Sequence, residues 1–215
     1  MMLLKVNKSL NFSKKARTFK NIRFVIIHYT GMQSARVSMN RLKNPKSKVS
    51  CHYLIDRKGS IFRMVEDNKV AWHAGKSKWQ NIANLNKCSI GIELQNKGHF
   101  FSYQNFPKKQ IFSLIKLIKI LMKKYKINKK NILGHSDIAP LRKLDPGEKF
   151  PWNFLSSKGV ATWYPKFKLK NYDIKLKVKR QIFFKNIYKI GYRFFNLSKI
   201  TKKDRKIVMA FQRRY

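Results

Sequence analysis

Two histidines and one aspartate have the types and positions of a hydrolytic metal site. His28 ends the apolar run VIIH, and His135 ends a second short apolar run, ILGH. Asp145 follows in a loop that also holds three prolines. Two neutral imidazoles and one carboxylate form a common three-ligand zinc set that leaves a fourth position open for water. Such a centre lowers the pKa of bound water to about 7 and polarises a carbonyl oxygen, so the chemistry indicated is hydrolysis.

The position of each residue supports this interpretation, but a structural alternative exists. A strand end holds a side chain rigidly and leaves its tip at the sheet edge, where a substrate can reach it. A single histidine there is more often a satisfied polar residue, and no H-E-x-x-H helix signature is present. Carboxylates are scarce in this chain, with 9 Asp and Glu against 50 Lys and Arg, so a buried carboxylate favours a catalytic explanation.

The elements that must position these residues follow from apolar patterning. Short apolar, β-branched runs predict strands at 22–27, 52–55, 61–65, 89–94 and 132–135. A five-residue loop containing Gly59 joins the second and third runs, which predicts a hairpin. Apolar residues at helical spacing over 108–125, with lysines between them, predict an amphipathic helix. The order predicts an α/β fold with a mixed central sheet flanked by helices.

The chain divides by composition into four parts. Residues 1–20 are basic and are expected to form a loosely ordered lead-in, and 21–165 hold the candidate site. Residues 166–180 are rich in lysine and predict a linker. Residues 181–215 show helical spacing again and predict a small helical segment.

The net charge of +41 admits two interpretations. One is attraction to a polyanion such as nucleic acid, anionic lipid or an anionic wall polymer. The other is compositional drift towards lysine, which the even spread of basic residues along the chain favours. A nucleic-acid-binding protein would carry a reader motif, and neither zinc-finger spacing nor an RNA-binding aromatic signature is present, so no specific nucleic-acid partner is expected.

Four segments in order resemble the N-acetylmuramoyl-L-alanine amidase family, a group of zinc amidases related to phage lysozyme-type amidases and to peptidoglycan recognition proteins. They are VIIHYTG, SCHYLIDRKGSIFRMVEDNKVAWHAGKSKW, CSIGIELQN and GHSDIAPLRKLDPGEKFPW. The resemblance runs from about residue 21 to residue 155. It implies hydrolysis of the amide bond between N-acetylmuramic acid and L-alanine, in peptidoglycan or in muropeptides, during wall degradation or recycling.

The resemblance also implies a role for each site residue. His28, His135 and Asp145 would hold one zinc ion per chain, and Glu93, within SIGIEL, would be the general base. Lys143 would stabilise the oxyanion of the tetrahedral intermediate. The structural alternatives are that Glu93 pairs with a lysine and that Lys143 is one more solvated cation.

Two further segments carry weaker resemblances. The AWHAG segment and its neighbour imply that Trp72, His73 and Trp79 line the substrate cleft, whereas the alternative places both tryptophans in the core. Near the C-terminus, YKIGY and VMAFQRRY resemble the small helical peptidoglycan-binding modules that are often attached to these amidases. The alternative is that these helices only cover an apolar face of the amidase.

Several expectations remain open at this point. A non-catalytic peptidoglycan receptor of the same fold would be expected to lack a zinc ligand, yet all three are present. No apolar run approaches the roughly 18 residues of a membrane helix, and no secretory signal is readable, so a cytoplasmic monomer is expected, with a periplasmic or envelope-associated protein as the alternative. A missing signal favours anhydro-muropeptide recycling, whereas a wall-binding tail favours intact wall as the substrate.

Overall fold

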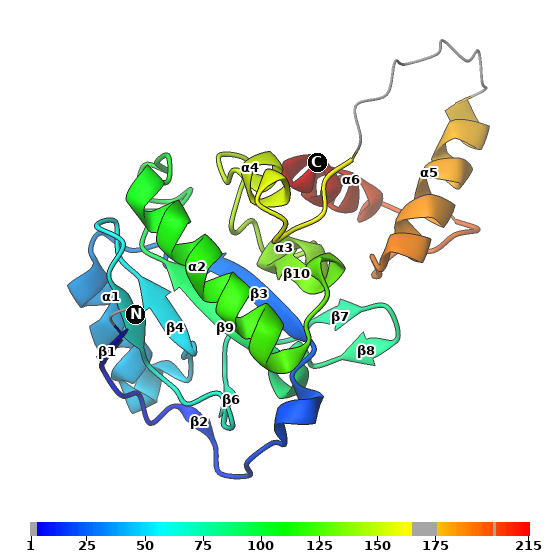
Figure 1. Cartoon of the computed structure of the whole chain (residues 1–215). Helices are drawn as coiled ribbons and strands as arrows, with labels where there is room; N and C mark the ends of the chain where they lie inside the picture. The colour runs from blue at the N-terminus through cyan, green and yellow to red at the C-terminus, as the bar shows by residue number, and fades with distance from the viewer. Residues whose placement is uncertain (1–3, 165–175, 200) are drawn as a thin grey trace.

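A six-stranded mixed sheet forms the centre of the computed structural model, which describes residues 4–164, 176–199 and 201–215 (Figure 1). In spatial order the strands are β1 (Leu4–Val6), β5 (Ile61–Arg63), β4 (Tyr53–Ile55), β9 (Ser89–Leu94), β3 (Phe24–Tyr29) and β10 (Ile132–Gly134). Neighbouring strands are parallel except β4 and β5, which form the hairpin expected from the sequence. The predicted α/β fold class is confirmed.

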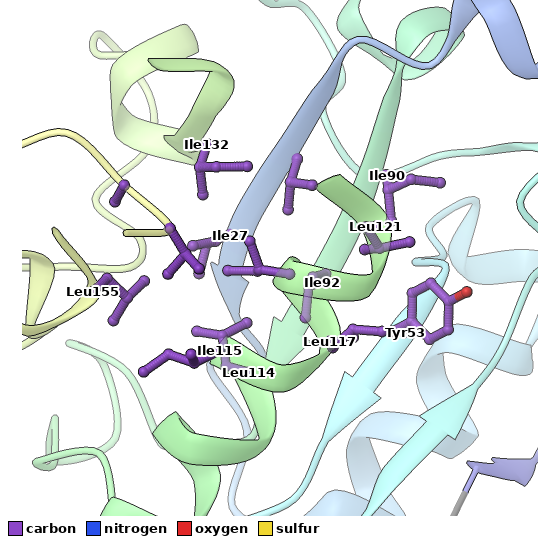
Figure 2. Close-up of a cluster of buried hydrophobic side chains, with 14 of the residues drawn as sticks. Ile27, Tyr53, Ile90, Ile92, Leu114, Ile115, Leu117, Leu121, Ile132 and Leu155 are labelled. Atoms are coloured by element: carbon purple, nitrogen blue, oxygen red, sulfur yellow. The ribbon is translucent and has the colours of Figure 1, made fainter. Parts of the chain in front are cut away.

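Helix α2 (Lys108–Tyr125) covers one face of the sheet and has the bounds expected from its apolar spacing. Its buried side chains, which include Leu114, Ile115 and Leu121, pack against alternate residues of the strands, among them Ile27 and Ile92 (Figure 2). Burial of this face supplies most of the helix's stability, because an isolated helix of this length is marginal in water. The lysines of α2 lie on its exposed side.

The alternation of side chains along β3 and β9 decides what the other face carries. Val25 and Ile27 point toward α2, so Ile26 and His28 point away from it. In the register of the two strands, His28 pairs with Glu93 and Ile26 pairs with Gly91. The face opposite α2 therefore presents a histidine and a glutamate side by side at the carboxyl ends of two parallel strands.

The remaining elements are short and surround the sheet. They are β2 (Phe12–Ser13), β6 (Val70–Ala71), β7 (Lys78–Trp79), β8 (Ile82–Ala83), α1 (Ala35–Lys43), α3 (His135–Ile138), α4 (Trp152–Ser157) and the 3₁₀ helices η1 (Phe19–Asn21), η2 (Pro45–Ser47), η3 (Leu85–Cys88) and η4 (Lys129–Asn131). Strand β2 pairs with β6, and β7 pairs with β8. His135 was expected at the end of a strand, and it is the first residue of α3, directly after β10.

The basic N-terminal lead-in, residues 1–20, was expected to be loosely ordered, and for its described residues 4–20 this expectation is wrong. Strand β1 adds to the sheet edge beside β5. Asn11 is buried, and its side-chain amide donates to the carbonyl oxygens of Leu42 and Asn44, at the C-terminus of α1. Long-range pairing of this kind has no local sequence signature, whereas the many lysines of the segment suggest disorder.

The C-terminal helices α5 (Leu176–Ile190) and α6 (Asp204–Arg214) pack on the same body as the sheet (Figure 1). A second apolar core joins Phe24 and Ile26 of β3 to Ile187 of α5 and Ile207 of α6. The predicted linker, 166–180, lies outside the described residues over 166–175, and its last five residues belong to α5. Within the described part of the chain, no helix has the length and apolar character of a membrane span.

Candidate active site

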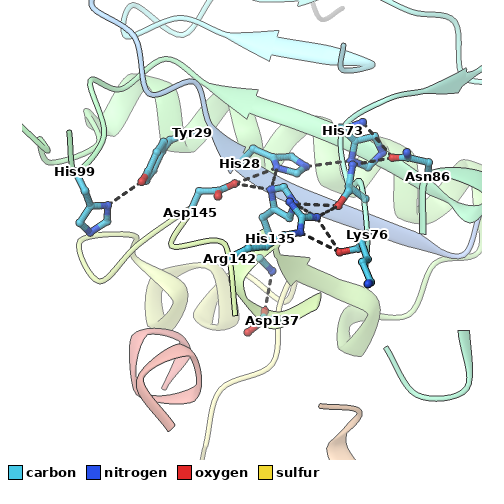
Figure 3. Close-up of polar contacts among 12 residues, drawn as sticks. His28, Tyr29, His73, Lys76, Asn86, His99, His135, Asp137, Arg142 and Asp145 are labelled. Atoms are coloured by element: carbon cyan, nitrogen blue, oxygen red, sulfur yellow. Dashed lines mark hydrogen bonds and ion pairs between the residues drawn. The ribbon is translucent and has the colours of Figure 1, made fainter. Parts of the chain in front are cut away.

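Three side chains from distant parts of the sequence meet at the carboxyl end of the sheet. His28 comes from β3, His135 from the start of α3, and Asp145 from the loop that follows α3 (Figure 3). The Nδ1 atoms of the two histidines are 2.9 Å apart, and each lies 3.0 Å from Asp145 Oδ2. All three residues are buried. The structure therefore brings the three expected ligand residues into one group that can hold a metal ion.

The hydrogen bond on the far side of His135 assigns its tautomer. Its Nε2 lies 3.1 Å from the carbonyl oxygen of Ala74. A carbonyl only accepts, and this contact is shorter than the 3.4 Å between Nε2 and Arg142 Nη2, so the imidazole proton lies on Nε2 and the Nδ1 lone pair points at Asp145. Arg142 donates to the same carbonyl and to that of Lys76, which holds the segment after Trp72 in place.

A longer chain of hydrogen bonds assigns the tautomer of His28. His28 Nε2 lies 3.1 Å from His73 Nδ1, and His73 Nε2 lies 3.2 Å from Ser89 Oγ. Ser89 in turn donates to the carbonyl of Leu85, so the hydroxyl accepts from His73 and His73 accepts from His28. Burial lowers the pKa of His28 to about 4, and burial also lowers the pKa of His73, so both rings are neutral. The His28 Nδ1 lone pair therefore faces the group as well.

The donor set of this group fits a divalent cation. The third member is the carboxyl group of Asp145, which is ordinarily ionised near neutral pH and which a bound cation would keep ionised. Two lone pairs and one carboxylate then face one another with no proton between them. Three acceptors at 2.9–3.0 Å repel unless a cation lies among them. Two imidazoles and one carboxylate are a set that zinc accepts with a position left open.

Glu93 lies beside this group with an unsatisfied carboxylate oxygen. It pairs with His28 across β3 and β9, and its buried Oε2 has no hydrogen-bond partner among the described residues. Burial raises the pKa of Glu93 to about 8, the charge of Asp145 adds to this, and Lys143 opposes it. A carboxyl group with a pKa near neutrality can exchange a proton with a reacting water.

A cavity of about 1020 Å³ opens over the group and gives a substrate access to it. His28, His135 and Asp145 contribute to its lining, and so do Glu93 and Lys143. All five residues expected to bind metal or to act in catalysis thus face one cavity.

The structure separates the three residues expected to bind substrate. Trp72 and His73 line the cavity, and His73 also hydrogen-bonds His28. Trp79 is only 3% exposed and packs against Tyr192 in the second core, so the expected place of Trp79 in the cleft is wrong. The reason is the C-terminal segment, because Trp79 fills the space against Gly191, where any side chain would overlap its ring.

Sequence reasoning did not single out several residues that shape the cavity. Arg142 fixes the carbonyl that orients His135, and Lys206, Met209 and Arg213 of α6 line the cavity itself. Among 50 Lys and Arg, no local signal distinguishes such cations. The i, i+3, i+7 spacing of the three α6 residues gives one helix face, but the sequence does not say what that face meets.

Comparison with known proteins places these residues in a family context. The family of N-acetylmuramoyl-L-alanine amidases matches residues 18–148. The N-acetylmuramoyl-L-alanine amidase AmiD of Escherichia coli is 38% identical over 157 residues, which are 67% of this chain and 56% of that protein. The 1,6-anhydro-N-acetylmuramyl-L-alanine amidase AmpD of Haemophilus influenzae is 46% identical over 112 residues, 51% of this chain and 59% of that protein. The match thus spans a little over half the length of these relatives.

Solved structures of amidases are also similar to this chain. The complex of AmiD from E. coli with the substrate anhydro-N-acetylmuramic acid-L-Ala-D-gamma-Glu-L-Lys has a TM-score of 0.78 and 30% identity, and the match covers 94% of this chain and 83% of that one. The structure of AmpDh3 from Pseudomonas aeruginosa has a TM-score of 0.73 and 28% identity, and the match covers 94% of this chain and 85% of that one. Both matches cover nearly all of this chain.

Proposed function

Because this chain belongs to the N-acetylmuramoyl-L-alanine amidase family, we propose that it is a zinc-dependent hydrolase of the amide bond between N-acetylmuramic acid and L-alanine. The observation that carries the proposal is the convergence of His28, His135 and Asp145 beside Glu93 in one accessible cavity. These three side chains would hold one zinc ion. When bound, zinc supplies a positive centre that lowers the pKa of water and polarises the scissile carbonyl.

Glu93 is proposed as the general base. Its Oε2 is buried and free of hydrogen bonds to the described residues, so it is available to accept a proton from the attacking water. The proton would then pass to the leaving amine of L-alanine, which must be protonated to depart. A carboxylate held in an apolar site next to the ligand group suits this shuttle, because burial raises its proton affinity.

Lys143 is proposed to stabilise the oxyanion. It lines the cavity and its positive charge acts on both Glu93 and His28, so it lies close to where the carbonyl carbon would be attacked. A fixed cation facing the developing negative charge lowers the barrier most in a site that excludes water. Lys143→Ala should therefore cost roughly 3 kcal/mol of transition-state stabilisation, the usual effect of one lost donor.

Soluble muropeptides are the proposed substrate class. The structure similar over nearly all of this chain contains anhydro-N-acetylmuramic acid-L-Ala-D-gamma-Glu-L-Lys, and a cavity of about 1020 Å³ has room for a ligand of that size. Intact wall is the second substrate that the family offers, because the muramic acid to alanine bond is the same in both.

Mass spectrometry of the reaction products tests the proposal. Purified protein would be incubated with the anhydro-muropeptide above and, separately, with insoluble sacculi. Release of the free peptide with an N-terminal L-alanine from the muropeptide is the expected result. Release from sacculi as well would extend the substrate to intact wall. If the zinc-loaded protein binds muropeptide and releases no peptide from either substrate, it is a receptor and not an enzyme.

A further inference from the structure

Helix α6 forms part of the wall of the catalytic cavity. Lys206, Met209 and Arg213 line the same cavity as His28 and Glu93. These three residues share one face of the helix, and Ile207 and Ala210 on the neighbouring face are buried in the second core. The C-terminal segment therefore contributes side chains to the candidate active site.

Buried contacts hold α6 in this position. Arg214 stacks on the ring of Trp152 in α4, with its guanidinium carbon 3.4 Å from the ring centroid, and it donates to the carbonyl of Ile132 at the end of the sheet. Tyr192, between α5 and α6, is fully buried and donates to Asp137 of α3. Asp204 at the start of α6 pairs with Arg180 of α5. The cavity-facing side of α6 is thus presented by a fixed scaffold.

Arg213 offers an incompletely used guanidinium to the cavity. Its side chain is only 16% exposed, and its Nε lies 3.9 Å from Glu148, which is longer than a hydrogen bond. The described residues supply no hydrogen bond to its terminal nitrogens. The terminal nitrogens of Arg213 are therefore open to the cavity and can donate to an acceptor on a bound molecule.

The other charged groups that line this part of the cavity are cations. Among the described residues, Lys206 Nζ donates to the Leu141 carbonyl alone, at 3.4 Å, and Arg41 of α1 also lines the cavity. The acidic residues of the lining are Glu93 and Asp145, and both belong to the catalytic group. Away from that group the lining carries only cations, and Glu148, which faces Arg213 Nε from outside the lining, is itself paired with His99. A planar guanidinium binds a carboxylate with two parallel hydrogen bonds.

We propose that the cavity-facing side of α6 is a substrate subsite in which Arg213 and Lys206 bind the carboxylates of the peptide stem. The inference rests on the proposed function, because it takes the muropeptide as the substrate. In L-Ala-D-gamma-Glu-L-Lys the γ-linkage leaves the α-carboxylate of the glutamate free, and the lysine provides a second carboxylate. Met209 lies between the two cations on the helix face and packs against the intervening aliphatic part of the stem.

Steady-state kinetics with two muropeptides test the subsite. The first substrate is anhydro-N-acetylmuramic acid-L-Ala-D-γ-Glu-L-Lys, and the second is the same molecule with both carboxylates converted to carboxamides. The variants are Lys206→Gln, Arg213→Gln and their combination. Arg205→Gln is the matched control, because Arg205 is an exposed cation on the same helix that does not line the cavity.

The combined variant should raise KM for the acidic substrate roughly five- to tenfold, with kcat unchanged, since two partly exposed charge pairs are lost. For the amidated substrate, the combined variant should have the same KM as the unmodified protein. Arg205→Gln should change KM for neither substrate. Equal changes for both substrates, or no change for the acidic one, would overturn the inference.

Two further measurements keep these outcomes separate from other failures. Melting temperature and zinc content show whether Arg213→Gln folds, and Lys206→Gln at an exposed position gives a smaller KM effect of about two- to threefold without that risk. If the unmodified protein cleaves neither substrate, the proposed function fails. If it cleaves both with the same KM, only the subsite fails.

Discussion

Two buried polar clusters meet at Gly91 and use similar residue types in opposite ways. The metal-site cluster comprises His28, His73, His135 and Asp145, and the Arg17 cluster comprises Arg17, His52, Tyr53, Asp67 and Tyr125. The Gly91 amide donates to His52, and the absence of a side chain at Gly91 leaves room for the ring of His73, which a Cβ would overlap. Each cluster therefore depends on the same glycine.

In the Arg17 cluster the carbonyl and carboxylate acceptors meet donors. Arg17 donates to the carbonyls of Asp67, Asn86 and Ser89, at 3.0, 3.0 and 2.7 Å. The Asp67 carboxylate accepts from the hydroxyls of Tyr53 and Tyr125. A network whose acceptors are paired in this way stabilises the fold.

In the metal-site cluster the outward-facing atoms are satisfied and the inward-facing atoms are not. The Nε2 protons of His28 and His135 are donated to His73 and to the Ala74 carbonyl, so three acceptors face one another beside an open cavity. In this protein the candidate active site is therefore distinguished from the Arg17 cluster by acceptors left without donors, and not by the residue types present.

Removing a ligand should have the largest effect. His135→Ala is expected to abolish stoichiometric zinc binding and to lower turnover about 10³-fold or more, because several kcal/mol of Lewis-acid stabilisation are lost. Zinc per chain by elemental analysis and peptide release measure the two effects. The matched control is His52→Gln in the Arg17 cluster, which should lower the melting temperature and keep the metal. Full activity of metal-free protein would show that the cluster is structural after all.

Removing the base should separate chemistry from metal binding. Glu93→Gln keeps the shape of the side chain and removes its proton affinity, so turnover should fall on the order of 10²-fold or more while zinc content is retained. Single-turnover kinetics with elemental analysis provide the measurement. Unchanged turnover would place the base elsewhere in the cavity.

Breaking the relay to His28 should weaken zinc binding without removing a ligand. His73→Ala leaves the His28 Nε2 proton without its acceptor, and loss of such an outer partner typically costs about 10- to 100-fold in metal affinity. Competition with a chromophoric chelator measures the affinity. His73→Asn, whose side-chain oxygen can take the place of Nδ1, should restore most of it. If both variants bind zinc as the unmodified protein does, His73 only fills space over Gly91.

The smallest effect on chemistry should come from the Arg17 cluster. Asp67→Asn is expected to lower the free energy of unfolding by about 1–3 kcal/mol near pH 7, with zinc content and turnover unchanged, because an amide accepts fewer hydrogen bonds than a carboxylate. Chemical denaturation of the unmodified protein and of Asp67→Asn measures the difference in their free energies of unfolding.

The difference in the free energy of unfolding between the unmodified protein and Asp67→Asn should also depend on pH in a defined direction. Burial raises the pKa of Asp67, but hydrogen bonds from Tyr125 and Tyr53 outweigh this, and the net shift lowers the pKa. A carboxyl whose folded pKa lies below its unfolded value of about 3.9 stabilises the protein above that pH, and the contribution is lost as the pH falls through the folded pKa. The difference in the free energy of unfolding between the two proteins should therefore become smaller below about pH 4. A difference in the free energy of unfolding that becomes larger below that pH would contradict the ionised state of Asp67.

Local patterns in the sequence predict the main strands, helix α2 and the candidate ligands. Apolar spacing gave the bounds of α2, because a helix that buries one face must repeat its apolar residues every three to four positions. The hairpin of β4 and β5 followed from alternating runs about a short glycine loop. His28, His135 and Asp145 were found from their motifs, and the strand register then brought Glu93 beside them.

The long-range contacts follow from the tertiary structure and not from local patterns. It ordered the lysine-rich N-terminal segment, since β1 needed the free edge of β5, and it moved Trp79 from the expected cleft into the core against Gly191. It also brought Arg213 of α6 into the cavity of His28, 185 positions earlier in the chain. Sequence patterns report what a segment buries, but the partner of a buried face depends on elements far along the chain, which no local pattern encodes.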